Sequence, residues 1–158
     1  MPFTFTFFGT TYTTVNISSN GNIHFGTASA AYFNVPIPST SLPNAMISPF
    51  WDDLYLPAGG AIYTTVTGTA PNRVWVVEWR NVPHYGASTN GVTFEVQLVE
   101  SANHIWFLYQ DTTFGYSKFD NGTSATSGVE NAAGAAGNQY SYNTPVLTAG
   151  KVLHFWPQ

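Results

Sequence analysis

The sequence predicts an all-β fold, a two-sheet antiparallel sandwich or jelly roll of about ten strands with no substantial helix. Three observations predict it: apolar and polar residues alternate along most of the chain, no segment of ten or more residues carries a helical apolar stripe, and turn-forming residues recur about every 8–15 residues. The length of 158 residues suits one domain. Because the N-terminus lacks an export signal, we expect 1–158 to be a single β-sandwich domain excised from a longer secreted protein.

The first residues predict a strand followed by a hairpin. Three phenylalanines at alternate positions share one face of the strand: Phe3, Phe5 and Phe7. Asn20 and Gly21 then form a strong hairpin signal, because both residues tolerate a positive φ. This hairpin joins the strands that contain Ile17 and Ile23.

Residues 27–45 predict a long irregular connection, since they include three prolines and many small residues, and we expect it to cross between the sheets. Strand patterns follow at 46–50, 61–67, 73–82, 92–100, 104–110, 125–130, 140–142 and 151–156. The apolar row of 92–98 pairs with the row of 105–109. Segment 73–82 is apolar on both faces for much of its length, which indicates a central strand covered on both sides.

The composition excludes several function classes. Charged residues make up 8% of the chain, against about 25% in ordinary soluble domains, and four Lys and Arg side chains with a net charge of −4 cannot neutralise a run of phosphates. We therefore expect no nucleic-acid partner and no membrane insertion. Zero cysteines exclude disulfides and thiolate metal sites. The Lys-poor, aromatic-rich composition is typical of secreted β modules and predicts an extracellular or cell-surface location.

Catalytic signatures are absent from the sequence. The four histidines are scattered, which gives no support to a zinc site: His24, His84, His104 and His154. Nucleophile elbows, phosphate loops and metalloprotease motifs are missing as well. We expect no enzyme; if the chain were a glycan-active enzyme, Asp52, Asp53 or Glu130 would be its acids.

Carboxylates suggest an ion pair or a calcium site. We expect Arg80 to be at least partly buried and paired with Asp52, Asp53 or Glu78, because a guanidinium on a central strand needs a partner. Calcium is the one cofactor that the sequence leaves open. Its weak candidate ligands are Asp52, Asp53, Asp111 and Asp120.

Aromatic residues are more numerous than one small core needs. Exposed aromatic rings beside Asn, Gln and Thr are suited to stacking on sugars or polymers. Loops 83–91 and 111–122 combine aromatic residues with glycines, with no indication whether they share one end of the sandwich. The candidate ligand-binding residues are Tyr85, Tyr116, Phe119 and Trp51.

A family resemblance rests on six segments: FFGTTY (7–12), SSNGN (18–22), SPFWDDL (48–54), EWRNV (78–82), FEVQL (94–98) and SGVEN (127–131). Together they resemble a β-rich accessory module of large secreted bacterial proteins, such as peptidases and adhesin-like surface proteins. The PFWDD segment also resembles, more distantly, the nidogen-like extracellular domain. Both resemblances imply a non-catalytic role outside the cell.

The leading hypothesis is a binding or adhesion module that attaches a larger protein to a glycan, a polymer, or a matrix or cell-surface protein. The alternative is a structural spacer or a self-assembling fibre subunit. For the alternative, the N-terminal Phe-Thr-Phe-Thr-Phe strand suggests an open edge through which copies pair as a homo-oligomer.

Overall fold

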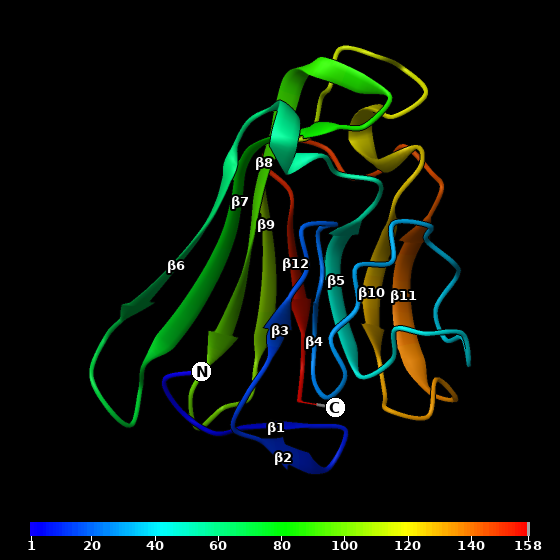
Figure 1. The fold of residues 1–158 in the computed structure, drawn as a ribbon. Coiled ribbons are helices and arrows are strands. Elements are labelled where there is room, and N and C mark those ends of the chain that lie inside the picture. The colour runs from blue at the N-terminus through cyan, green and yellow to red at the C-terminus, as the bar shows by residue number, and fades with distance from the viewer. Residues whose placement is uncertain (158) are drawn as a thin grey trace.

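The computed structural model describes the backbone of residues 1–157 and, apart from Ser88, their side chains. This part of the chain is all-β, as predicted, with twelve strands in three antiparallel sheets (Figure 1). Helical structure within it is confined to two single 3-10 turns, η1 (Leu56–Ala58) and η2 (Asp120–Gly122). The strand count exceeds the expected ten partly because Thr10–Tyr12 forms a strand that the sequence did not predict.

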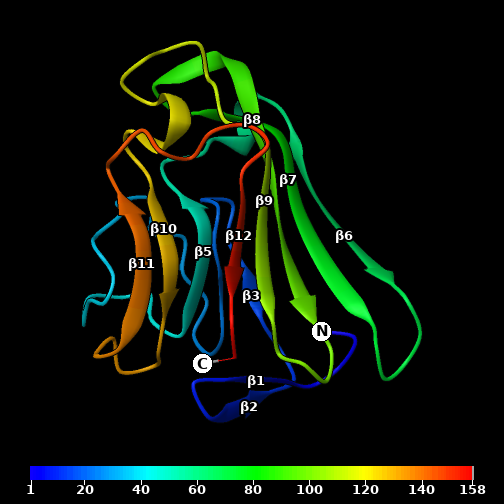
Figure 2. The same ribbon diagram turned by 180° about the vertical axis from the view of Figure 1, so that it is seen from behind.

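Two five-stranded sheets form the sandwich, and Figure 2 shows them from behind. The open sheet has the order β12-β9-β8-β7-β6 and consists of β6 (Ala61–Thr67), β7 (Val74–His84), β8 (Ala87–Val99), β9 (Ile105–Asp111) and β12 (Val152–Phe155). The covered sheet has the order β11-β10-β5-β4-β3 and consists of β3 (Asn16–Ile17), β4 (Ile23–His24), β5 (Met46–Trp51), β10 (Thr126–Glu130) and β11 (Gly137–Tyr142). The hairpin of β1 (Phe5–Phe7) and β2 (Thr10–Tyr12) closes one end.

The core lies between the two sheets. The predicted rows of β8 and β9 pair in register, with Val96 opposite Phe107 and Leu98 opposite Ile105. Phe94 of β8 stacks on Phe50 of the covered sheet at a ring-centroid distance of 5.4 Å. Buried aromatic rings therefore join the sheets, which confirms a sandwich-like fold.

The predicted hairpin is present, with Ile17 opposite Ile23 in β3 and β4. Its Gly21 has φ +75°, and a Cβ atom there would collide with the carbonyl group of Phe50. Only glycine meets both requirements.

Residues 27–45, which we call the strap, do not cross between sheets, so that expectation is wrong. The strands on either side of the strap, β4 and β5, are neighbours in one sheet, and the strap lies over that sheet's outer face. The indole Nε1 of Trp51 donates to the carbonyl oxygen of Ala31 at 2.9 Å, and Ile37 packs with Met46 and Trp51 in a second small core. The physical reason is that β5 presents large apolar side chains on both faces, and the outer ones need cover.

The expectation for 73–82 holds on one face of β7. Trp75, Val77 and Trp79 point into the core, whereas on the opposite face Arg80 keeps 53% of its side chain exposed. β7 is next to the edge strand rather than central. The outer face of β7 near its C-terminal end is polar. Glu78 and Arg80 pair with each other there and remain in contact with solvent, so no other segment has to cover them.

Candidate binding groove at the loop end

A buried carboxylate organises the end of the sandwich where β5 and β7 finish. Asp52 is 3% exposed and its Oδ2 accepts a hydrogen bond from the Ser124 hydroxyl at 2.6 Å. His84 Nδ1 accepts the N–H of Gly86, so the ring proton is assigned to Nε2, which donates to Asp52 Oδ1 at 3.2 Å. Asp52 therefore ties both sheets together at this end.

Backbone hydrogen bonds place two tyrosines side by side. The Tyr55 N–H donates to the Pro83 carbonyl at 2.7 Å, and the Tyr85 N–H donates to the Asp53 carbonyl at 2.8 Å. The rings of Tyr55 and Tyr85 then meet edge to face with their centroids 5.1 Å apart. The contact between the two rings and the backbone hydrogen bonds on either side hold both tyrosines in place.

A third tyrosine from the strap completes what we call the tyrosine groove, lined by Tyr32, Tyr55, Tyr85, Asp53 and Asn20. The groove has a volume of about 550 Å³. The exposed fractions of its tyrosines are 58%, 38% and 65% in chain order. Asn20 Nδ2 donates to the Ala30 carbonyl at 3.1 Å and so fixes the strap beside the groove.

Asp53 supplies the carboxyl group of the groove. Burial raises the pKa of Asp53; the neighbouring His84 opposes this shift and Asp52 adds to it. Asp53 thus offers oxygen atoms to hydroxyl groups in a partly desolvated site, where a hydrogen bond is stronger than in open water.

The two predicted contact loops meet at this same end. The Phe119 ring stacks on the His84 ring with centroids 3.7 Å apart, and it lies against Gly86. The ring centroids of Tyr116 and Phe119 are 6.3 Å apart. Lys118 covers the Phe119 ring, with its Nζ 4.6 Å from the centroid. Tyr116 and Phe119 therefore form a second aromatic pair at the same end of the sandwich as the groove.

The calcium candidates do not come together as a set. Asp120 Oδ1 accepts the N–H of Phe114 at 2.7 Å, and Asp111 Oδ1 accepts the Thr113 hydroxyl at 2.8 Å, so each carboxylate shapes its own loop. Within residues 1–157 no group of three or more His, Cys, Asp or Glu side chains could hold a metal ion.

Trp51 and Arg80 lie away from the groove. Trp51 is 0% exposed because the strap covers it, so it cannot touch a ligand as the sequence suggested. Arg80 pairs with Glu78 at 2.6 Å and stacks over Tyr63, and it makes no ion pair with Asp52 or Asp53. The reason is that Arg80 faces outward on the open sheet, whereas Asp52 is held at the loop end.

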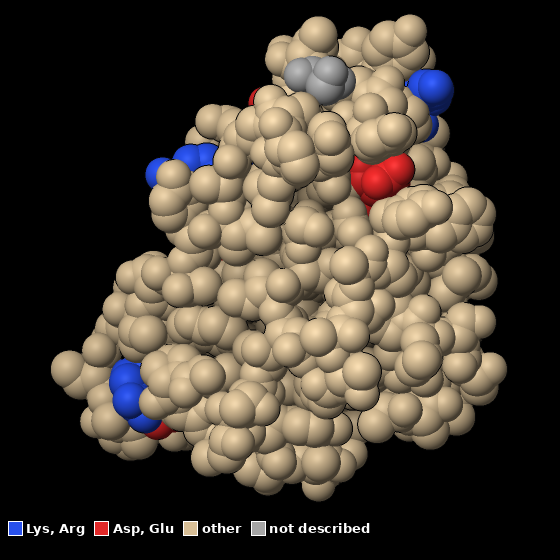
Figure 3. All heavy atoms as spheres, viewed as in Figure 1, with Lys and Arg blue, Asp and Glu red and all other residues tan. Residues whose placement is uncertain are grey.

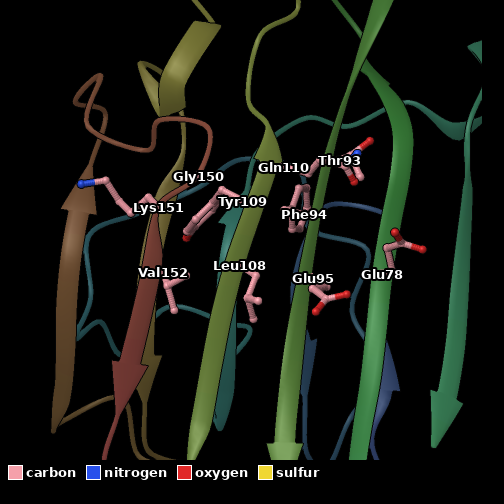
Figure 4. A pocket seen from close by; sticks show the side chains of 10 residues that line it. All are labelled: Glu78, Thr93, Phe94, Glu95, Leu108, Tyr109, Gln110, Gly150, Lys151 and Val152. Atoms are coloured by element: carbon pink, nitrogen blue, oxygen red, sulfur yellow. The ribbon is translucent and has the colours of Figure 1, made fainter. Parts of the chain in front are cut away.

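The open sheet carries a second, shallower depression of about 340 Å³ (Figure 4). Across it Glu78 lies directly opposite Glu95, and Leu108 and Val152 continue the same row. Lys151 points away toward β11 and donates to the Tyr140 hydroxyl at 2.7 Å. Among the described residues that line this depression, the aromatic side chains Phe94 and Tyr109 are buried, so it offers a weaker platform than the tyrosine groove.

Sequence reasoning missed five residues of the loop end: Asn20, Tyr32, Tyr55, His84 and Ser124. Tyr55 alone carried a signal, since it follows the Asp-Asp pair closely in sequence and precedes a proline turn. His84 ends β7, and the other three lie in the hairpin (Asn20), the strap (Tyr32) and the loop before β10 (Ser124), so only the fold brings them together.

Fold and site together define an all-β sandwich module with its candidate binding residues in loops at one end. The chain belongs to the NIDO-related family, whose model matches residues 1–154. It is 28% identical to mouse alpha-tectorin and 29% identical to human alpha-tectorin over 154 residues. These alignments cover 83% of this chain but 7% of each tectorin. No solved structure matches the chain.

The family confirms the distant resemblance to the nidogen-like domain, whereas the bacterial accessory module finds no support in these matches. NIDO-related domains and the alpha-tectorins are extracellular, which confirms the predicted location outside the cell. None of the described helical segments is long and apolar enough to span a membrane.

Proposed function

We propose that the chain is a non-catalytic extracellular module that attaches a larger protein to a glycan of a matrix or cell surface through the tyrosine groove. One observation carries the proposal. Three partly exposed tyrosines, contributed by the strap, the segment after β5 and the β7–β8 turn, converge beside the single carboxyl group of Asp53.

The chemistry of the groove suits a neutral sugar chain. The apolar faces of sugar rings stack on tyrosine, while Asp53 and Asn20 offer hydrogen-bonding groups for hydroxyls. The volume of about 550 Å³ lies within the usual range for small-ligand sites. The face of the molecule in Figure 3 carries few charged side chains, so short-range contacts rather than long-range attraction would select the ligand.

The carboxylates favour binding over hydrolysis. A glycosidase needs two carboxyl groups on either side of the bond that it cleaves. Asp53 is the one acidic side chain among the described residues that line the groove. Asp52 is buried and hydrogen-bonded to Ser124 and His84, and Glu130 is hydrogen-bonded to Ser39 beneath the strap. This arrangement supports a module without catalytic activity.

A glycan array tests the proposal, with the wild-type protein and the Tyr55→Ala/Tyr85→Ala double variant compared in calcium and in EDTA. We expect the wild type to retain a defined set of glycans in both buffers and the double variant to lose them. Retention of the same glycans by the double variant would place the site elsewhere, and binding in calcium alone would assign it to the acidic loops.

A further inference from the structure

β6 presents a free sheet edge. Figures 1 and 2 show β6 as the outermost strand of the open sheet. On its inner side it pairs with β7 along all seven residues. Among the described residues, no hydrogen bond from outside this ladder reaches the backbone of 61–67. Half of the N–H and C=O groups of β6 therefore point outward without a protein partner.

The sequence of β6 lacks the usual protection of an edge. Its residues Ala-Ile-Tyr-Thr-Thr-Val-Thr include no charge and no proline, and most of them favour strands. Tyr63 and Val66 are 50% and 43% exposed. Such a strand is a template for the addition of another strand.

The other edges are shorter or occupied. In β1, which has three residues, the N–H of the central Thr6 donates to Asn103 Oδ1 at 2.9 Å, so the edge that the sequence suggested is short and partly occupied. β11 has six residues, one fewer than β6. β2, β3 and β12 have three, two and four residues. β6 is thus the longest uncovered edge in residues 1–157.

We propose that β6 is a self-association site whose partner is β6 of a second copy, an inference that goes beyond the proposed glycan binding. Antiparallel pairing about a two-fold axis at Thr64 places Ile62 opposite Val66 and Tyr63 opposite Thr65. Apolar β-branched residues and an aromatic–threonine pair are favourable across strands. The same patch serves both copies, as a symmetric dimer requires.

Electrostatics favour a second copy over a charged partner. The central position of the pairing holds two threonines, and Arg80 near the end of β6 is already neutralised by Glu78. The chain carries 12 charged residues in all, 4 basic and 8 acidic, so repulsion between copies is small. The dimer would extend the open sheet from five to ten strands.

Sedimentation equilibrium over a hundredfold concentration range tests the inference. We expect the wild-type mass to rise from 17.2 kDa toward twice that value. Thr64→Lys should weaken the dimer about tenfold, because it sets two like charges directly opposite each other. Thr148→Lys, at an exposed position between β11 and β12, is the matched control and should dimerise like the wild type. A constant monomer mass of the wild type would overturn the proposal.

A mixing experiment fixes the pairing register. Thr64→Lys and Thr64→Glu should each dimerise about tenfold more weakly than the wild type, and an equimolar mixture should regain the dimer because opposite charges now meet. Monomers in the mixture, or equal weakening by Thr148→Lys, would contradict the proposed edge. Both Thr64 variants should keep the glycan binding of the wild type, so failure of one proposal leaves the other standing.

Discussion

The two sheets of the sandwich treat their outer faces differently. On the covered sheet, the strap buries Met46 and Trp51 of β5 completely. On the open sheet, the corresponding face of β7 carries Glu78 and Arg80, which reach solvent. β5 and β7 both contain apolar residues on two faces, yet the strap covers the outer face of β5 and no corresponding connection covers the end of β7 that carries Arg80. Alternation along a strand identifies a core-facing side, but the path of a distant connection decides whether the other side is buried.

The difference also determines where binding chemistry lies. The strap supplies Tyr32 to the groove, and Asn20 holds the strap in place. The open sheet, without such a connection, presents a shallow depression and a free edge at β6. The connections of the covered sheet therefore contribute Tyr32 to the groove, and the open sheet contributes Tyr85 at the β7–β8 turn while the edge of β6 stays free.

Replacing one tryptophan on each outer face should give the largest contrast. Trp51→Ala removes a fully buried side chain beneath the strap, and we expect a loss of about 3–5 kcal/mol in the free energy of unfolding. Trp106→Ala, which removes the stack on His154 at 3.8 Å on the open sheet, should cost about 1 kcal/mol. Urea unfolding of both variants measures the difference. Equal losses would mean that the strap does not bury Trp51.

A buried carboxylate beneath the strap makes the covered sheet sensitive to pH. Glu130 Oε2 accepts the N–H of Ser39 at 2.9 Å, while Oε1 has no partner. Burial raises the pKa of Glu130 from 4.5 to about 7. Between these two pH values the folded state binds more protons than the unfolded state, so Glu130's contribution lowers stability as pH rises and is fully unfavourable above about pH 7.

Glu130→Gln should therefore be more stable than the wild type at pH 8, by on the order of 1–3 kcal/mol, and the advantage should shrink toward pH 5. Burial lowers the pKa of His24, which lies on the same sheet face across Met46, and this acts in the opposite direction below about pH 6.5. His24 is present in both proteins, so their difference isolates Glu130. Urea unfolding at several pH values measures it, and a difference independent of pH would show that Glu130 is hydrated.

The smallest effect belongs to the open sheet. Glu95 lies directly opposite Glu78, and like charges in that position are unfavourable. Glu95→Gln should raise stability by about 0.2–1 kcal/mol at pH 7 and low salt, and added salt should reduce the gain. Thermal unfolding at two salt concentrations checks this. A loss of stability would show that the contact of Glu95 with Gln97 at 2.6 Å outweighs the repulsion.

Local sequence patterns predicted most of the strands and the core. The alternation in 92–98 and 105–109 identified residues that pair in the core, and Asn20-Gly21 identified a hairpin that is present. These features depend on neighbours in sequence or on simple alternation, so one chain segment contains the information. Glu78, one of the three partners expected for Arg80, lies two residues away on the same face and forms the ion pair.

Features that depend on distant segments were not predictable in this way. Nothing near Trp51 indicates that the strap will cover it, and nothing near Tyr85 indicates that Tyr32 and Tyr55 will join it. The role of Asp52 depends on Ser124, which is 72 residues away. Burial of an outer face and assembly of a groove are therefore properties of the folded chain rather than of any local pattern.

Titration calorimetry with a glycan retained on the array tests the central claim most directly, using two partly exposed tyrosines. Tyr85 lies in the tyrosine groove, and Tyr63 lies on β6 of the open sheet. We expect Tyr85→Ala to weaken binding by about 1–3 kcal/mol, as loss of an aromatic anchor does, and Tyr63→Ala to leave the dissociation constant unchanged. Equal affinity of Tyr85→Ala and the wild type, or a loss confined to Tyr63→Ala, would contradict binding at the groove.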